Sequence, residues 1–299
     1  MGTSIALVGP GAIGSTVAAL LHAAGHQILV CGRTPRDCLD VRPDPDVGIG
    51  GPIVVPGPTL TDPDDVDGPV GLVFLAVKDT QNAASAAWLD RLCDDRTIVC
   101  ALQNGVEQVD RVGPFCPAST VVPAVVWFSS ETQPQGWVRL RTEARMVLPD
   151  NDAARGLTAI VGSSDLLIEL DPDFISATWR KLLTNALAGF LVLTGRRSGM
   201  FRRADITSLA RTYVAECLAV ARAEGARLPD DVIDEIPASF AGVAEDMTTS
   251  MLTDREAGRP LEWDIRNGVI LRKAAVHGLS APISEILVPL LAAASDGPG

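Results

Sequence analysis

The sequence contains few of the residues that bind metals or form disulfide frameworks. Its 299 residues include only three histidines, and none of the six cysteines belongs to a C-x-x-C pair. The spacing of these residues matches no zinc-site pattern. We therefore expect no metal ion, and we interpret the cysteines as small hydrophobic residues in a reducing cytoplasm.

Positive charge is also scarce. Lysine and arginine total 25 against 37 aspartates and glutamates, which gives a net charge of −12. Such a field repels phosphate backbones and anionic lipids, so we expect neither nucleic acid nor membrane partners. The chain lacks both a secretory signal pattern and the run of about 18 apolar residues that a membrane span needs. These absences predict a cytoplasmic protein, in which local donors must hold any anionic ligand.

The first half of the chain alternates short apolar runs with helical segments. Hydrophobic residues make up 47% of the chain, and its length suits two domains. The runs are continuously apolar, which is typical of strands buried on both faces of a parallel sheet. The predicted strands cover residues 4–8, 27–31, 72–77 and 97–101, and the predicted helices cover 13–24 and 80–92.

Two further stretches of the first half differ from this pattern. Residues 35–69 are rich in proline, which favours loops or short edge strands. Residues 120–149 contain β-rich runs without helices between them, so we expect an antiparallel addition to the sheet.

Long helical periodicity begins near residue 170. The predicted helices cover residues 174–194, 204–224, 243–254, 265–277 and 283–294. The fold class predicted from these patterns is α/β, with an N-terminal doubly wound domain of the Rossmann type over residues 1–170. An all-α C-terminal domain over residues 171–299 follows it.

A Gly-x-Gly-x-x-Gly motif follows the first strand directly and opens the first helix. Gly9 allows the tight turn, and Gly14 allows close contact between helix and strand. Gly11 lets a pyrophosphate approach the N–H groups at the helix start, where Ala12 and Ile13 lie. We interpret these residues as a dinucleotide site; the alternative is a glycine-rich turn without a ligand.

The end of the second strand predicts which dinucleotide binds. Sites selective for NAD carry an acidic residue there for the ribose 2′-hydroxyl, whereas this chain has Arg33 and Arg36. A guanidinium pairs well with a phosphate, so the sequence predicts NADPH/NADP⁺, with Arg33 as the main partner of the 2′-phosphate. The alternative is that both arginines are solvated surface residues.

The sequence contains only three lysines, so the positions at which lysine occurs point to a specific need for this residue type. Lysine can donate a proton near neutral pH, and arginine cannot. Lys78 follows an apolar strand at its carboxyl end, where open α/β sheets bind their ligands. Lys181 lies in the first helix of the second domain, with Asn185 on the same helix face. We interpret Lys78 and Lys181 as functional, and Lys273 as a solvated lysine.

Polar side chains stand out at three more positions. Asn104, in a Gln-Asn-Gly sequence, follows another apolar strand, although Asn-Gly also favours simple turns. Ser250 and Glu262 lie in a polar stretch of an otherwise apolar helical region. Taken alone, Ser250 suits a helix cap or solvent, and Glu262 suits an exposed position.

Together these motifs resemble the ketopantoate reductase (2-dehydropantoate 2-reductase) family. GPGAIG, VKD with Lys78, QNG with Asn104, W-R-K-x-x-x-N and S-M-L-x-D-x-x-x-G-R-P-x-E stand in the family's order over nearly the whole chain. The resemblance implies a Rossmann domain that binds NADPH, a helical domain, and an active site in the cleft between them. Lys78 and Asn104 would line the nicotinamide side of that site.

The resemblance also implies roles in hydride transfer to the C2 ketone of a 2-keto acid. Lys181 would act as the general acid, and Glu262 would pair with it or orient it. Ser250 would hold the substrate carboxylate, and Asn185 a substrate hydroxyl. These roles suit the reaction, because hydride addition builds negative charge on an oxygen that an ammonium group can stabilise and protonate.

One position departs from the family pattern. Gly189 replaces a second asparagine that helps to hold the substrate hydroxyl, and the loss of such a group lowers discrimination for that hydroxyl. The leading interpretation is NADPH-dependent reduction of ketopantoate to pantoate in pantothenate biosynthesis. One alternative is a paralogous reductase of another 2-keto or carbonyl substrate. The other is a non-catalytic NADP(H) sensor, against which the retained Lys181, Asn185, Ser250 and Glu262 argue. The apolar second domain is compatible with a homodimer.

Overall fold

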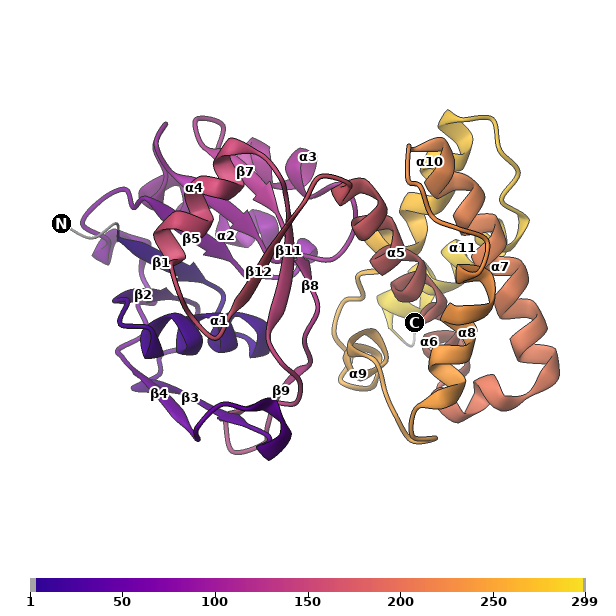
Figure 1. Ribbon diagram of the computed structural model, residues 1–299, viewed down its shortest axis with the longest axis horizontal. Helices are drawn as coiled ribbons and strands as arrows, with labels where there is room; N and C mark the ends of the chain where they lie inside the picture. The colour runs from indigo at the N-terminus through magenta and orange to yellow at the C-terminus, as the bar shows by residue number, and fades with distance from the viewer. Residues whose placement is uncertain (1–3, 298–299) are drawn as a thin grey trace. The chain divides into compact units, whose positions relative to one another are not determined.

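The computed structural model describes residues 4–297 and divides into two compact units. The first unit, Met1–Phe174, carries the strands, and the second, Ile175–Gly299, is helical (Figure 1). The division falls after Phe174, close to the predicted boundary at residue 170, and the last strand of the first unit is β12 (Leu167–Asp171). Within the described residues no helix is both long and apolar enough to cross a membrane.

A parallel sheet of five strands, in the order β2-β1-β5-β6-β7, forms the centre of the first unit. Its strands are β1 (Ile5–Val8), β2 (Ile28–Cys31), β5 (Leu72–Leu75), β6 (Ile98–Ala101) and β7 (Thr120–Pro123). The chain order reverses direction at β1, from which β2 lies on one side and β5 on the other. In such sheets ligands bind at the carboxyl ends of the strands beside this reversal.

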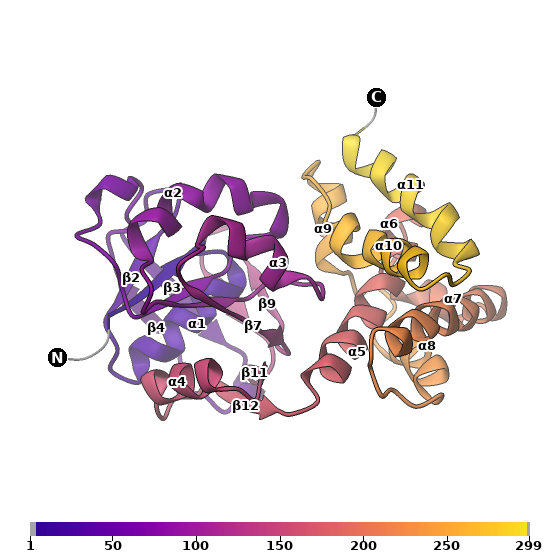
Figure 2. The same ribbon diagram turned by 90° about the horizontal axis from the view of Figure 1, so that it is seen from above.

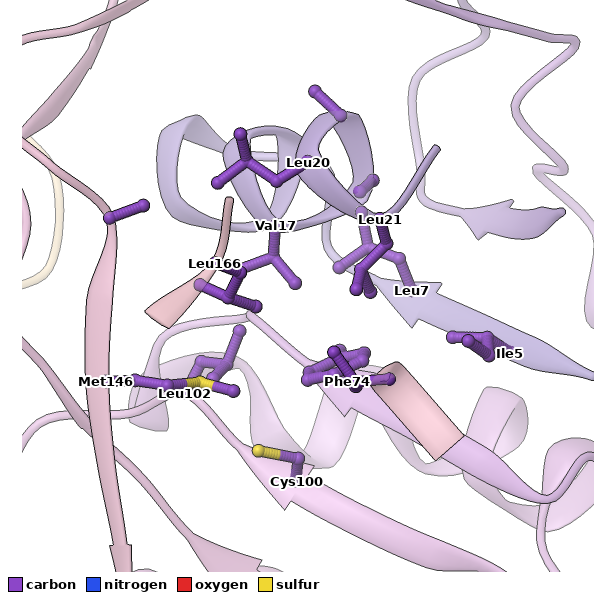
Figure 3. Close-up of a cluster of buried hydrophobic side chains, with 14 of the residues drawn as sticks. Ile5, Leu7, Val17, Leu20, Leu21, Phe74, Cys100, Leu102, Met146 and Leu166 are labelled. Carbon is purple, nitrogen blue, oxygen red and sulfur yellow. The ribbon is translucent and has the colours of Figure 1, made fainter. Parts of the chain in front are cut away.

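Helices cover both faces of this sheet (Figure 2). α1 (Ala12–Ala23) and α4 (Asp152–Val161) pack on the face that carries Leu7 and Phe74, as the close-up in Figure 3 shows for α1. α2 (Asn82–Leu92) and α3 (Gln108–Val112) pack on the opposite face. Because successive strand residues point to opposite faces, continuously apolar strands can fill both layers.

The strands after β6 do not extend the main sheet as expected. Only β7 joins it, and that pairing is parallel. The later strands, β8 to β12, lie in two separate sheets, which have the orders β4-β3-β10-β9 and β12-β11-β8 and also contain the earlier strands β3 and β4. Their bounds are β3 (Cys38–Pro43), β4 (Ile53–Pro56), β8 (Val125–Val126), β9 (Ser130–Thr132), β10 (Val138–Leu140) and β11 (Arg145–Pro149).

The prediction of an antiparallel addition to the main sheet is therefore wrong, and the composition of α1 explains why. This helix is buried on all sides from Gly14 to Leu21. The main sheet covers one side only, so apolar residues of the four-stranded sheet, such as Val41 and Leu140, complete the cover. A helix that is apolar all round needs a second layer against it.

The second unit is helical, which together with the first confirms the predicted fold class. Its helices are α5 (Phe174–Leu187), α6 (Gly189–Thr194), α7 (Ala204–Ala223), α8 (Val232–Gly242), α9 (Ser250–Glu256), α10 (Val269–Val276) and α11 (Pro282–Asp296). A π-helical turn, Asp264–Gly268, leads into α10. Short 3₁₀ helices occur at Pro45–Val47, Pro63–Asp65, Asp79–Gln81, Gly113–Phe115 and Ser198–Arg202.

Three predictions for this unit need correction. The single helix over 174–194 is divided at Ala188 into α5 and α6, and Gly189, a poor helix former, is the first residue of α6. The helix over 243–254 begins only at α9, because the Thr249 side chain caps it by accepting the Leu252 N–H. α8 was not predicted at all; it contains Pro237, and proline normally indicates a helix end.

Candidate active site

Two of the three loop glycines are required by packing. Gly9 has a φ of 95°, and its N–H donates to the Cys31 carbonyl oxygen at 2.9 Å. A Cβ at Gly9 would lie 2.7 Å from Val77 Cγ1, and one at Gly14 would lie 2.9 Å from Ala76 Cβ and clash with the Gly9 carbonyl oxygen. Both residues let the β1–α1 turn lie against the segment that follows β5.

The middle glycine, Gly11, faces open space. No heavy atom lies within 4 Å of the place a Cβ would take there. Gly11 caps α1, and the first hydrogen bond of the helix runs from Ser15 N to the Gly11 carbonyl oxygen at 2.8 Å. The N–H groups of Ala12 and Ile13 precede that bond and so have no carbonyl partner within the helix. With no acidic residue in the first turn, this end suits a phosphate.

Arg33 and Arg36 lie beside this loop at the end of β2. A Cβ at Gly32 would be 2.7 Å from Pro10 Cδ, so the two segments are in van der Waals contact. Most of the other arginines are held in ion pairs. The side chains of Arg33 and Arg36 have no hydrogen-bond or ion-pair partner within residues 4–297, and Arg33 is exposed. Positive charge is therefore present next to the loop.

Lys78 and Asn104 follow the neighbouring strands β5 and β6, so they lie at the same edge of the sheet. Gln103 ties these two strand ends together. Its buried Nε2 donates to the Val77 carbonyl oxygen at 3.1 Å and to Asn82 Oδ1 at 2.6 Å. Sequence reasoning did not single out Gln103, although a polar residue directly after a buried strand was the available signal.

In the second unit, Lys181 and Asn185 lie one turn apart on α5, and both are half-buried. Burial, and after it the positive charge of Arg266, lowers the pKa of Lys181 to about 8. A lysine with this pKa can both hold and release a proton near neutral pH. That property is required of a general acid working at such a pH.

Ser250 and Glu262 meet at Arg266, a residue that sequence reasoning missed. Arg266 Nη2 donates to Ser250 Oγ at 3.1 Å and to Glu262 Oε2 at 2.8 Å. The Arg266 and Glu262 side chains are only 4% and 5% exposed, which makes this a buried ion pair. The available signal was the spacing of four residues between an acid and a base in a helical region.

Packing around Gly189 explains why this position carries a glycine. A Cβ there would lie 3.1 Å from Asn267 Nδ2 and 3.1 Å from Leu291 Cδ1. Asn267 is fully buried, and its Nδ2 donates to the Ala186 carbonyl oxygen at 2.9 Å and to the Tyr213 hydroxyl at 3.0 Å. An asparagine at position 189 would have to displace this carboxamide, so a second substrate-reading asparagine does not fit without rearrangement.

Comparison with known proteins decides the family. Residues 5–153 match the model described as ketopantoate reductase PanE/ApbA, and residues 173–295 match the model of the ketopantoate reductase PanE/ApbA C terminal. The chain belongs to the ketopantoate reductase family.

Relatives within this family match the chain along its whole length. A Mycobacterium tuberculosis protein named 2-dehydropantoate 2-reductase is 62% identical over 299 residues, 100% of each chain. A Caulobacter vibrioides protein of the same name is 35% identical over 98% of this chain and 99% of its own. The structure of a dimeric ketopantoate reductase from Staphylococcus aureus matches with 27% identity and a TM-score of 0.87, over 99% and 100% of the two chains. The predicted family is thus confirmed.

Proposed function

We propose that this protein catalyses the NADPH-dependent reduction of 2-dehydropantoate (ketopantoate) to pantoate, a step of pantothenate biosynthesis. The observation that most strongly supports this function is the full-length match, at 62% identity, to a relative named 2-dehydropantoate 2-reductase. The alternatives, a paralogous reductase and a non-catalytic sensor, have no comparable support. Oxidation of NADPH by the purified protein in the presence of ketopantoate tests the proposal directly.

The first unit carries residues that fit NADPH. The N–H groups of Ala12 and Ile13 would bind the pyrophosphate across the open face of Gly11. Arg33 would pair with the 2′-phosphate, because its guanidinium is exposed and has no partner among residues 4–297. Lys78 and Asn104 would line the nicotinamide side at the carboxyl ends of β5 and β6. When bound, the cofactor supplies the hydride.

The second unit carries residues that fit the 2-keto acid. Lys181 Nζ would donate its proton to the C2 oxygen as negative charge develops there, and would regain a proton from solvent. Ser250 would hold the substrate carboxylate, and Asn185, one turn from Lys181, would hold a substrate hydroxyl. Glu262, held by Arg266, would orient the polar groups around Lys181.

Replacing Arg33 with alanine is expected to weaken NADPH binding by about 10–100-fold, as expected for the loss of a charge-assisted hydrogen bond. NADH lacks the 2′-phosphate, so its affinity is expected to change less than about threefold. Titration of the purified variant with both cofactors, followed by nicotinamide fluorescence, measures the two effects.

Arg155→Ala is the matched control, since Arg155 is an exposed arginine of the same unit that is paired with Asp150 and Asp152. It should leave both affinities unchanged. Equal losses for NADPH and NADH in Arg33→Ala would mean that another group binds the 2′-phosphate.

We further propose a cytoplasmic location and a homodimeric assembly. The relative from Staphylococcus aureus is described as dimeric, which supports the assembly by analogy. No helix of residues 4–297 is suited to cross a membrane, which is consistent with the proposed location.

A further inference from the structure

Arg266 is given no contact with substrate or cofactor in the function proposed above, although it contacts Ser250 and Glu262, which belong to that site. The residue is only 3% exposed and is placed by the π-helical turn Asp264–Gly268. π-helical turns within helices occur frequently at functional sites. Buried arginines are rare unless they are paired, so the partners of Arg266 are informative.

The hydrogen bonds of Arg266 leave donors unused. An arginine has five N–H donors, and both contacts, to Ser250 Oγ and Glu262 Oε2, are made by Nη2. Nε is buried and has no hydrogen-bond partner in the described part of the chain. A buried donor without a partner is costly and uncommon in native proteins. This guanidinium therefore has hydrogen-bonding capacity for a ligand that accepts.

The contact between Arg266 and Ser250 fixes the direction of the serine hydroxyl. Arginine can only donate, so Ser250 Oγ is the acceptor of the 3.1 Å hydrogen bond. The hydroxyl proton of Ser250 is then left to donate to a third group. A carboxylate only accepts, so it suits this position and an ammonium group does not.

The charged side chains around Arg266 also favour the binding of an anion. Arg266 and Lys181 are two cations, close enough for the charge of one to lower the pKa of the other. Glu262 is the buried carboxylate that pairs with Arg266, and it offsets one of these two positive charges. The nearby buried Asp254 is already paired with Arg259 at 2.9 Å. A local excess of positive charge therefore exists within a chain of net charge −12.

We propose that Arg266 is a positioning and specificity-determining residue for the carboxylate of the 2-keto acid. It directs the Ser250 hydroxyl toward the carboxylate and supplies the positive charge that the carboxylate pairs with. This inference rests on the proposed function, because it assumes that Ser250 and Lys181 belong to the substrate site.

The test compares ketopantoate with its lactone, which keeps the C2 ketone and lacks the free carboxylate together with the free C4 hydroxyl. Arg266→Gln is expected to raise KM for ketopantoate by about 10–100-fold and to change kcat by less than about fivefold. For the lactone, kcat/KM should stay within about threefold of wild type. Arg266→Lys keeps the charge but not the planar fork, so it should recover part of the KM loss.

A double-mutant cycle tests the link to Ser250. If Arg266 acts through the Ser250 hydroxyl, Ser250→Ala should add less than about threefold to the KM increase caused by Arg266→Gln. Arg272→Gln is the control variant, since Arg272 is a half-exposed arginine of α10 paired with Asp264, and it should leave both substrates unchanged. Melting temperature and NADPH affinity establish that each variant is folded.

Equal losses for acid and lactone, or a loss confined to kcat, would overturn the role of Arg266. If Arg266→Gln does not fold, Ser250→Ala must show the same selective loss on the acid, and equal losses there would overturn the role too. If wild type does not reduce the lactone, inhibition by pantoate and by pantoyl lactone provides the same comparison. A wild-type protein that fails to reduce ketopantoate would instead contradict the proposed function.

Discussion

Lys181→Ala is expected to lower kcat for ketopantoate reduction by a factor on the order of 10²–10⁴, the usual contribution of a positioned acid. Its affinity for NADPH should stay within about twofold, since Lys181 lies in the helical unit and the glycine loop in the other. Steady-state kinetics and fluorescence titration measure the two quantities. The control is Arg180→Ala, which removes an exposed neighbour paired with Glu235 at 2.6 Å. Near-normal turnover in Lys181→Ala would remove this lysine from the mechanism.

The pH dependence of the wild-type rate of reduction tests the role of the same lysine independently. Burial, followed by the charge of Arg266, lowers the pKa of Lys181 to about 8. In the proposed mechanism the ammonium form is the acid, so the rate of reduction should fall about tenfold per pH unit above the pKa. A rate that stays constant to pH 10 would argue against this acid.

The lowered pKa also has a consequence for stability. A lysine whose pKa is lower in the folded state costs stability while it is charged, and this cost disappears as the pH rises from the folded toward the unfolded pKa. At pH 7 the cost is fully present. Lys181→Met should therefore lose activity and still have a Tm at least as high as wild type, which separates loss of chemistry from loss of fold.

Glu262→Ala is expected to lower the free energy of unfolding by about 3–5 kcal/mol, because it leaves the buried Arg266 without its counter-charge. Urea denaturation at pH 7 measures this. Glu235→Ala breaks an exposed ion pair, with side chains 42% and 49% exposed, and should cost less than about 1 kcal/mol.

Removing both partners of the buried pair should cost less than removing one. Glu262→Leu combined with Arg266→Leu leaves no buried charge, so its stability should exceed that of Glu262→Ala. A loss below about 1 kcal/mol in Glu262→Ala would mean that solvent already compensates the Arg266 charge.

The parts of the site that the sequence predicts are those with local causes. The β1–α1 loop needs glycine at positions 9 and 14 because neighbouring atoms leave no room for a side chain, and this requirement is visible in the motif itself. Lys181 and Asn185 share a helix face by simple periodicity. Such features depend on a few consecutive residues, and a pattern can show them.

The parts that the sequence does not predict depend on contacts between distant segments. Arg266 joins Ser250 to Glu262 only because the π-helical turn and α9 pack together. Gln103 holds the ends of β5 and β6 together through its hydrogen bond to the Val77 carbonyl oxygen, far away in the sequence. The pairing of β9 and β10 with β3 and β4 in a separate sheet likewise follows from the need to cover α1. The spacing of four residues indicates the pairing of Arg266 with Glu262, but no local pattern encodes the contact of Arg266 with Ser250 or that of Gln103 with Val77.

Gly189 is the position that bears most directly on how the substrate hydroxyl is recognised. A Cβ at position 189 would lie 3.1 Å from Asn267 Nδ2, so the family's second asparagine would fit there only if this carboxamide moved. In the proposed site, recognition of the ketopantoate hydroxyl would then rest on Asn185 and other groups.

The most direct test of the proposed function is the rate of NADPH oxidation with ketopantoate, measured beside 2-keto acids that lack its C4 hydroxyl. We expect kcat/KM to be higher for ketopantoate by a factor on the order of 10² or more, as hydroxyl-reading sites achieve. Equal rates on all the acids, or no oxidation with ketopantoate, would contradict the assignment.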